Sequence, residues 1–232
     1  MIIGNGLVAS AFATYSFSTD PNITVFASGV SNSTETREEA FLREKALLLK
    51  TLENNKLIYY FSSCSIEDPQ LRTTPYAVHK VAMESLVRSA KNYRIFRLPQ
   101  VVGKTSNPTT LTNFLYQHIR SGTRFHVWKS ATRNIIDIDH VASIVHHLHK
   151  CLEANNTTLN IAAPYSTPVL KLVTTFEAIL NTEAHYDVIE AGGSYSIEAA
   201  TALRAAKELN IDFENKYIER LLRKYYCERY NL

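Results

Sequence analysis

The sequence is poor in the residues that mark secreted, metal-bound or membrane proteins. Only three of its 232 residues are cysteine (Cys64, Cys151 and Cys227), and they lie far apart. An odd number of distant cysteines indicates neither a disulfide framework nor a metal site, so we expect a reducing, cytoplasmic location. No apolar run approaches the roughly 18 residues of a membrane span, and no basic segment precedes the apolar N-terminus as in a signal peptide.

The sequence also has a low net charge and no basic patch. The net charge is +3, and no run of lysine or arginine occurs. A nucleic-acid partner is therefore not expected. With 45% hydrophobic and 20% charged residues, the composition is that of an ordinary globular protein. The length suffices for one core with a small appended lobe.

Strand-like and helix-like segments alternate through the first hundred residues. In chain order, the expected strands and helices cover 1–3, 10–17, 23–27, 35–54, 57–61, 75–91 and 94–98. In the second helix, Leu42, Ala46, Leu49 and Leu52 share one side. This alternation predicts an α/β fold of βαβ units, with a parallel sheet covered on both faces.

Beyond Gly103 the pattern loosens. The expected helices cover 109–120, 141–152, 169–180, 197–209 and 215–226, and the expected strands cover 125–128, 134–138, 158–162 and, at an edge, 186–189. No repeat, low-complexity tract or clear linker divides the chain, so we expect a single chain unit.

A glycine-rich turn follows the first strand. Gly4-x-Gly6-x-x-Ala9 stands between an expected strand and an expected helix, which is the context of a dinucleotide site. Gly4 allows the tight turn, and Gly6 lets the backbone approach a pyrophosphate at the helix N-terminus. Ala9 keeps the helix close to the strand. The turn therefore predicts a dinucleotide cofactor.

A tyrosine and a lysine stand four residues apart in Tyr76-Ala-Val-His-Lys80, on one face of the expected helix. A lysine beside a phenol lowers the phenol's pKa and makes tyrosine a usable acid and base near neutral pH. The upstream cluster Phe61-Ser-Ser-Cys-Ser65 offers hydroxyls for a substrate oxygen. On the pair alone, an exposed helix face is the simpler interpretation. The glycine turn before it makes the pair a catalytic candidate.

These motifs, in this order, resemble the extended short-chain dehydrogenase/reductase superfamily, in its NAD-dependent epimerase/dehydratase (nucleotide-sugar) group. Three later segments fit the same resemblance: Arg97-Leu-Pro-Gln-Val-Val-Gly103, Arg133-Asn-Ile-Ile-Asp-Ile-Asp-His-Val-Ala142 and Asn160-Ile-Ala-Ala-Pro-Tyr-Ser166. The resemblance implies a Rossmann-like doubly wound parallel sheet with a small C-terminal α/β lobe. Residues 1–106 and parts of 134–162 would form the cofactor domain, and 107–133 and 163–232 the substrate lobe. It also implies a homodimer through the helices flanking Tyr76.

The chain departs from the family after its first helix. From Asp20 it runs directly into Ile23-Thr-Val-Phe-Ala-Ser-Gly-Val-Ser31, which resembles the family's fourth strand. The usual second and third strands are missing, and with them the acidic residue that binds the adenosine ribose. The resemblance therefore leaves NAD and NADP both open as the cofactor.

A second departure lies in the serine cluster. Cys64 stands where the family's catalytic serine or threonine is expected, and a thiol is a poor hydrogen-bond donor. Either Ser63 or Ser65 substitutes for that residue, or Cys64 weakens the site. The Asp-Glu pair of sugar dehydratases is replaced by Cys64-Ser-Ile, so dehydration is not expected.

The resemblance assigns roles to individual residues. Tyr76 would transfer the substrate's hydroxyl proton, and Lys80 would lower the pKa of Tyr76 and bind the nicotinamide ribose. Cofactor contacts are implied at Gly4, Gly6, Ala9, Ala27, Gly29, Ser62, Lys80 and Leu98, and substrate contacts at Ser65, Gln100, Asn107 and Arg133. Arg133 would pair with a substrate diphosphate, since a guanidinium fork suits phosphate oxygens.

The predicted function is hydride transfer between NAD or NADP and a nucleotide-linked sugar, as keto-sugar reduction or epimerisation. Two alternatives remain: a binding or regulatory protein of the same fold without turnover, and an interaction subunit. The missing strands and Cys64 favour the first alternative. Retention of both Tyr76 and Lys80 favours the enzyme, because a pure binding protein needs neither.

Overall fold

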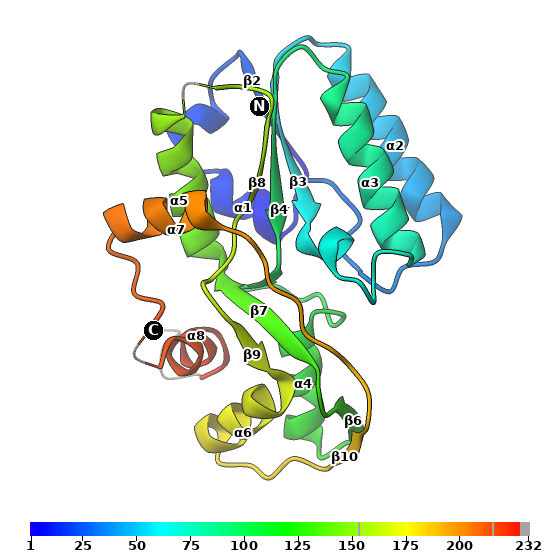
Figure 1. Ribbon diagram of the computed structural model, residues 1–232, viewed down its shortest axis with the longest axis vertical. Helices are drawn as coiled ribbons and strands as arrows, with labels where there is room; N and C mark the ends of the chain where they lie inside the picture. Colours follow the sequence, from blue (N-terminus) through cyan, green and yellow to red (C-terminus); the bar gives the residue numbers. More distant parts are fainter. Residues whose placement is uncertain (153, 215, 228–232) are drawn as a thin grey trace.

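The computed structural model describes residues 1–152, 154–214 and 216–227. A lobe built on a parallel sheet adjoins a smaller lobe that holds the shorter strands (Figure 1). The five strands of the large sheet are β1 (Ile2–Ile3), β2 (Ile23–Phe26), β3 (Leu57–Ser63), β4 (Tyr93–Leu98) and β8 (Thr157–Asn160). They are parallel, in the order β1-β2-β3-β4-β8. The predicted α/β fold with a parallel sheet is confirmed.

Helices cover both faces of this sheet (Figure 1). One face carries α2 (Glu38–Leu52) and α3 (Pro75–Arg88), and the other carries α1 (Leu7–Phe12), α5 (Ile138–Cys151) and α7 (Ala200–Glu208). Successive side chains of a strand point to opposite faces. In β3, Tyr59 therefore joins the larger hydrophobic core, whereas Tyr60 joins a second core with Leu48 and Met83. Two buried faces explain why β2 and β3 are apolar along most of their length.

β1 forms one edge of the sheet, and in the part of the chain that the structure describes no strand pairs with its outer side. Its partner β2 aligns Val25 with Ile2 and Phe26 with Ile3. The strand before the glycine turn thus lies beside the strand that resembles the family's fourth. This arrangement agrees with the absence of the second and third strands.

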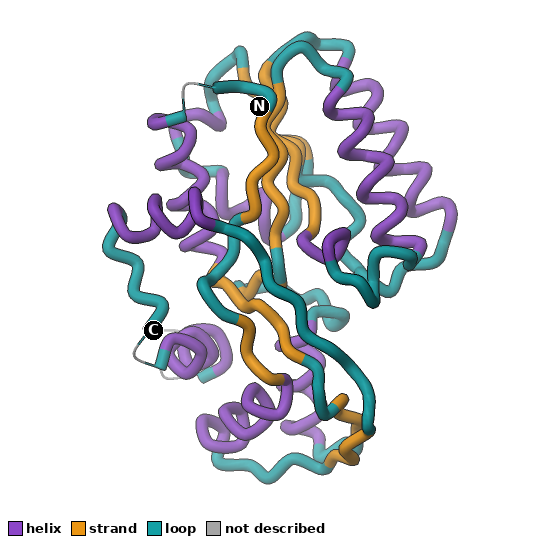
Figure 2. The backbone as a smooth tube through the Cα atoms, in the orientation of Figure 1, coloured by secondary structure: helices purple, strands orange, loops and turns teal. Residues whose placement is uncertain are grey.

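The elements of the smaller lobe are β5 (Gln100–Val102), α4 (Leu111–Ser121), β6 (Phe125–Trp128), β7 (Thr132–Asp137), β9 (Ser166–Pro168), α6 (Val169–Leu180), β10 (Tyr186–Ile189) and α8 (Tyr217–Tyr226). Within the described residues, this lobe holds the sheets β5-β7-β9 and β10-β6 together with helices α4, α6 and α8 (Figure 2). β7 pairs in parallel with β5 and antiparallel with β9, and β10 pairs in parallel with β6. A long loop leaves β10 and runs beside β7 towards α7 (Figure 2).

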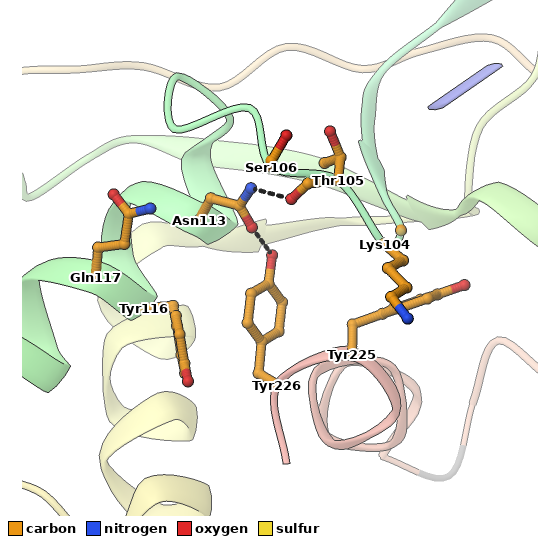
Figure 3. A pocket seen from close by; sticks show the side chains of 9 residues that line it. Lys104, Thr105, Ser106, Asn113, Tyr116, Gln117, Tyr225 and Tyr226 are labelled. Carbon is orange, nitrogen blue, oxygen red and sulfur yellow. Dashed lines mark hydrogen bonds between the residues drawn. The ribbon is translucent and has the colours of Figure 1, made fainter. Parts of the chain in front are cut away.

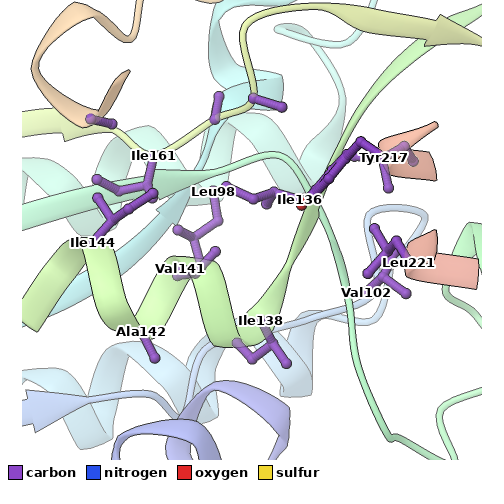
Figure 4. Close-up of a cluster of buried hydrophobic side chains, with 14 of the residues drawn as sticks. Leu98, Val102, Ile136, Ile138, Val141, Ala142, Ile144, Ile161, Tyr217 and Leu221 are labelled. Atoms are coloured by element: carbon purple, nitrogen blue, oxygen red, sulfur yellow. The ribbon is translucent and has the colours of Figure 1, made fainter. Parts of the chain in front are cut away.

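One hydrophobic core continues from the large sheet into the smaller lobe. Leu98 at the end of β4, Ile136 of β7 and Leu221 of α8 belong to the same buried cluster (Figure 4). Burial of this shared apolar surface holds the smaller lobe against the carboxyl ends of the large sheet's strands.

Several elements differ from the sequence prediction. The first helix ends at Phe12, and Ser16–Ser18 forms a separate 3-10 turn, η1. β5 and β9 were not expected, because strands of three residues are too short to show periodicity. β7 lies in the small sheet, and α7 packs beside α5, although the predicted division placed both differently. The exact domain boundaries stay a prediction.

The buried face of α2 is not the one on which Leu42, Ala46, Leu49 and Leu52 lie together. Leu42 and Leu49 are 54% and 43% exposed, whereas Leu48 and Glu44 are fully buried. None of the described helices is long and apolar enough to cross a membrane.

Candidate functional site

The carboxyl ends of neighbouring strands bring the predicted site segments to one edge of the sheet. The glycine turn follows β1, Ala27 to Gly29 follow β2, and the serine cluster ends β3. Leu98, which is buried, ends β4, and Gln100 begins β5. In open α/β sheets, ligands bind outside this edge of the strands. The arrangement therefore supplies one common site for segments that are far apart in the sequence.

The glycine turn has the shape that a pyrophosphate needs. Gly4 has φ +126°, and a β-carbon there would stand 2.3 Å from the Ala27 carbonyl oxygen. Gly6 is the N-cap of α1 without a side-chain cap, and its missing β-carbon would meet open space. Ala9 lies within α1 and is one of its buried residues. The backbone at Gly6 is thus open to an anionic ligand, so the turn fits a dinucleotide cofactor.

Tyr76 and Lys80 lie in the first two turns of α3. Pro75 opens the helix, and the Thr74 hydroxyl accepts a hydrogen bond from the Ala77 amide at 3.3 Å, a standard N-cap. Both side chains are buried, at 8% exposed for Tyr76 and 2% for Lys80. The Lys80 Nζ lies 5.8 Å from the centroid of the Tyr76 ring, within cation–π range. The two groups therefore share one buried face of α3.

Lys80 has a partner that sequence reasoning missed. Its Nζ donates hydrogen bonds to Glu44 Oε1 at 2.9 Å and to the Tyr60 hydroxyl at 3.3 Å. Burial by itself raises the pKa of Glu44, but Lys80 and hydrogen bonds from His79, Val30 and Tyr60 lower it to about 2. Glu44 therefore stays ionised. The available signal was the spacing of Glu44, Leu48 and Thr51, which puts all three on one face of α2.

The serine cluster is arranged around a buried thiol. After Ser63 the chain forms the 3-10 turn η2 (Cys64–Glu67), and the Ser63 hydroxyl accepts a hydrogen bond from the Ser65 amide at 3.2 Å. The hydroxyls of Ser63 and Ser65 lie 2.8 Å apart. Cys64 is fully buried, and this burial raises the pKa of its thiol. Cys64 thus has the properties of a core residue, while the two serine hydroxyls lie at the half-buried surface.

Two predicted substrate residues stand on the small sheet. Gln100 begins β5, and Arg133 lies on β7, where its Nη1 donates to the Thr132 carbonyl at 2.7 Å. Asn107 holds the following loop, since its side-chain oxygen accepts from the Thr109 amide at 3.0 Å. Arg97 forms a bidentate ion pair with Glu84, through Nε and Nη2 at 2.8 and 2.7 Å. Arg97 is thereby committed to α3 and has a structural role.

The loop 190–199 crosses from the smaller lobe to the large one, and sequence reasoning gave it no function. The Gly193 carbonyl accepts from the Thr132 amide at 3.2 Å, and the Glu198 carbonyl accepts from Asn160 Nδ2 at 2.8 Å. A β-carbon at Gly193 would stand 2.7 Å from Gln70 Nε2 of the large lobe. The loop therefore packs between the lobes.

Tyr195, in the middle of this loop, is half-buried. Its pKa is raised, first by burial and then by Cys64 and Asp68, while Arg133 lowers it. No periodic pattern marks this loop, so only the folded chain reveals that Tyr195 is half-buried within electrostatic reach of Cys64 and Arg133.

A separate cavity of about 240 Å³ lies between the loop after β5, α4 and α8 (Figure 3). Lys104, Tyr116 and Gln117 line it, and the Tyr226 hydroxyl donates to Asn113 Oδ1 at 2.7 Å. None of the predicted catalytic or cofactor residues lines this cavity. The described residues contain no cluster of three or more side chains able to hold a metal.

A family model and solved structures were compared with the chain. Residues 48–162 match the model of the NAD dependent epimerase/dehydratase family. No curated protein matches the sequence. UDP-glucuronic acid 4-epimerase from Bacillus cereus, in complex with UDP-glucuronic acid and NAD, is 16% identical, with a TM-score of 0.70 over 90% of this chain and 74% of its own.

Two further structures show the same fold. UDP-glucose 4-epimerase from Thermus thermophilus, in complex with NAD, is 12% identical, with a TM-score of 0.67 over 90% of this chain and 78% of its own. RMD from Pseudomonas aeruginosa, complexed with NADPH, is 16% identical, with a TM-score of 0.65 over 95% of this chain and 85% of its own. At such identities the likeness shows the fold alone. Residues 48–162, which carry Tyr76 and Lys80, belong to the NAD dependent epimerase/dehydratase family, as the sequence predicts.

Proposed function

We propose that this protein is an NAD- or NADP-dependent oxidoreductase that acts on a nucleotide-linked sugar, as a keto-sugar reductase or an epimerase. The observation that carries the proposal is the buried Tyr76–Lys80 pair on the face of α3 at the carboxyl edge of the sheet, beside an open glycine turn. A binding protein without turnover needs no such pair.

The residues present fit a nicotinamide dinucleotide. The open backbone at Gly6 would receive the pyrophosphate, with Ala27 and Gly29 beside it and Ser62 and Leu98 further along the strand edge. When bound, the nicotinamide ring supplies or accepts the hydride. Solved proteins of this fold were crystallised with NAD or with NADPH.

The adenosine end offers no selection between the two cofactors. β1 is an edge strand, so the strand that normally carries the ribose-binding acid has no counterpart beside it in the described residues. Arg43 binds the hydroxyl and carbonyl of Ser28 at 3.2 and 3.1 Å, and Arg37 pairs with Glu35. Both arginines thus have protein partners.

Proton transfer falls to Tyr76, the titratable hydroxyl of the pair. The Lys80 ammonium lies 5.8 Å from the centroid of the Tyr76 ring, so the pair brings a cation to the phenol. Ser63 and Ser65 present the hydroxyls that orient the substrate oxygen, because Cys64 is buried beneath them. No Asp-Glu pair follows Cys64, and elimination of water needs an additional acid and base, so we favour reduction or epimerisation over dehydration.

The substrate would lie between the serine hydroxyls and the small lobe. Arg133 on β7 would supply the positive charge for a diphosphate. Gln100, on the neighbouring strand β5, would offer a side-chain amide. Several solved structures of this fold were obtained with UDP-linked sugars or sugar acids, which matches this chemistry.

We also propose a cytoplasmic homodimer. Leu42 and Leu49 of α2 and Val78 and Val81 of α3 are exposed apolar residues on adjacent helices. An apolar surface on two packed helices is suited to a second copy of the same pair. The three free cysteines are compatible with a reducing compartment.

A second candidate is a regulatory or interaction protein of the same fold that binds the dinucleotide without turnover. The ion pair of Lys80 with Glu44 favours it, because a committed ammonium has fewer hydrogen-bond donors left for a ribose. Both candidates predict cofactor binding, so turnover separates them.

Titration of the purified protein with NADH and NADPH, followed by nicotinamide fluorescence, tests the proposal. Binding of at least one below millimolar concentration is expected; binding of neither excludes the enzyme. Tyr76→Phe should then retain binding and lose turnover of a keto-sugar nucleotide at least tenfold. Tyr93→Phe, at the opposite end of β4, is the matched control and should retain both.

A further inference from the structure

Glu44 is a buried carboxylate that the proposed mechanism does not use. It is 0% exposed, and four donors from three parts of the fold converge on its two oxygens. The distances are 2.7 Å from the Val30 amide, 2.7 Å from the Tyr60 hydroxyl, 3.0 Å from His79 Nε2 and 2.9 Å from Lys80 Nζ. A carboxylate held in this way cannot rotate without breaking several hydrogen bonds at once.

The same contacts fix Lys80. Its ammonium touches Glu44 Oε1 and the Tyr60 hydroxyl, and it lies 5.8 Å from the centroid of the Tyr76 ring. The backbone at Gly29 covers it, since a β-carbon there would stand 2.5 Å from Nζ. The position of the Lys80 ammonium beside Tyr76 is therefore determined by a residue of α2, a different helix.

The charges within this buried group balance. Glu44 is ionised, and its negative charge offsets the positive charge of Lys80. The other titratable groups near the pair are Tyr60 from β3, His79 from α3 and Glu84 from α3. Glu84 forms ion pairs with both Arg97 and Arg88, and Arg97 also pairs with Glu67. Without Glu44, the Tyr76–Lys80 pair would carry one uncompensated positive charge.

We propose that Glu44 is the positioning residue of the Tyr76–Lys80 pair: it holds the ammonium in place and sets the pH at which the pair releases its first proton. A nearby negative charge opposes that release, because it stabilises the protonated pair. Removing the charge favours release, whichever of the two groups gives up the proton. The catalytic meaning of this role rests on the proposed function.

The test is an NMR titration of the intact protein labelled at tyrosine Cζ and lysine Cε. Tyr76→Phe and Lys80→Met identify the two resonances. In Glu44→Gln, the first proton of the pair should leave about one to three pH units lower than in the unsubstituted protein. His79→Gln removes a neighbour of Glu44 but keeps the carboxylate, and it should leave that pH nearly unchanged.

A folded Glu44→Gln protein with an unchanged or higher pH of first release overturns the proposal. If Glu44→Gln does not fold, Glu44→Asp decides: the shorter carboxylate is withdrawn from Lys80, so the shift should be smaller but in the same direction. An absent shift overturns the proposal again.

The titration needs neither cofactor nor turnover, so it separates the two hypotheses. A protein that binds no cofactor disproves the proposed function but still reports the role of Glu44. Where turnover of a keto-sugar nucleotide is present, the pair must hold its proton in order to donate it, so the alkaline limb of the pH profile should move to lower pH in Glu44→Gln by the same amount as the NMR midpoint. A purely structural role of Glu44 would lower activity without moving that limb.

Discussion

The backbone at Gly29 lies directly against the ammonium of Lys80. A β-carbon at Gly29 would stand 2.5 Å from Lys80 Nζ and 3.0 Å from Glu44 Oε1. The loop after β2 therefore covers the buried ion pair between Lys80 and Glu44. The loop after β2 can approach Lys80 of α3 this closely because Gly29 has no side chain.

Gly29→Ala should displace Lys80 and leave the fold intact, because the added methyl group meets the end of a flexible side chain. We expect turnover to fall at least tenfold, the equivalent of about 1.4 kcal/mol in the barrier. Gly122→Ala is the matched control. It has φ +67° at the end of α4, so it costs stability without touching Lys80. Equal turnover in the two variants would contradict the role of Gly29.

The two glycines of the first turn should separate folding from binding. Gly4→Ala combines φ +126° with a backbone clash, so it should destabilise the protein by about 3 kcal/mol. Gly6→Ala adds a methyl group in open space at φ −84°, so stability should change by less than about 0.5 kcal/mol. Its methyl group enters the pyrophosphate space, and NADH or NADPH affinity should fall at least tenfold. Undiminished affinity would place the pyrophosphate elsewhere.

Glu44 should make the fold sensitive to acid. Its pKa is about 2 in the folded protein against 4.5 for the free side chain. A lowered carboxyl pKa stabilises the fold above pH 4.5, and this contribution is lost as the pH falls towards 2. The shift corresponds to about 3 kcal/mol. Urea unfolding across this range should show the loss.

Glu44→Gln provides the control for that titration. The variant should be less stable near neutral pH by about 3–5 kcal/mol, because Lys80 is left buried without a counter-ion. The difference from the unsubstituted protein should narrow as the pH falls. Glu190→Gln breaks an exposed ion pair with Lys129 and should cost less than about 1 kcal/mol. A difference that stays constant with pH would contradict the assignment to Glu44.

The order of strands and the positions of the glycine turn and the Tyr76–Lys80 pair follow from short-range patterns. Each of these features depends on residues within a few positions of one another. Buried strands and the turns beside them can therefore be predicted from short stretches of sequence. Glu44 was not predicted in this way, although its spacing with Leu48 and Thr51 was a signal for a shared helix face. Its burial depends on how α2 is rotated against α3, which exposes Leu42 and Leu49 instead.

Tyr195 escaped prediction for a related reason. Its loop has no periodicity, and its position is fixed by hydrogen bonds to Thr132 and Asn160, which are distant in the sequence. The three-residue strands β5 and β9 likewise exist only through pairing with β7. Contacts between lobes thus determine the part of the site that local patterns leave open.

The exposed leucines of α2 and valines of α3 should form the dimer contact. Leu42→Asp and Val78→Asp each introduce a charge into an apolar surface, at residues that are 54% and 55% exposed. We expect the monomer to become the main species in light scattering coupled to size exclusion. Val188→Asp, 50% exposed on the smaller lobe, is the matched control and should leave the dimer unchanged. A monomeric unsubstituted protein would refute the dimer.

The cysteines should differ sharply in reactivity, which tests whether Cys64 acts as a nucleophile. Cys64 is fully buried and its thiol has a raised pKa, so little thiolate forms and reagents do not reach it. Cys151 is exposed and lies 3.5 Å from His147 Nε2. Iodoacetamide should therefore modify Cys151 in the native protein and Cys64 only after unfolding, as mass spectrometry of the digested protein can show. Rapid native alkylation of Cys64, with loss of turnover, would instead support a thiol at the centre of the chemistry.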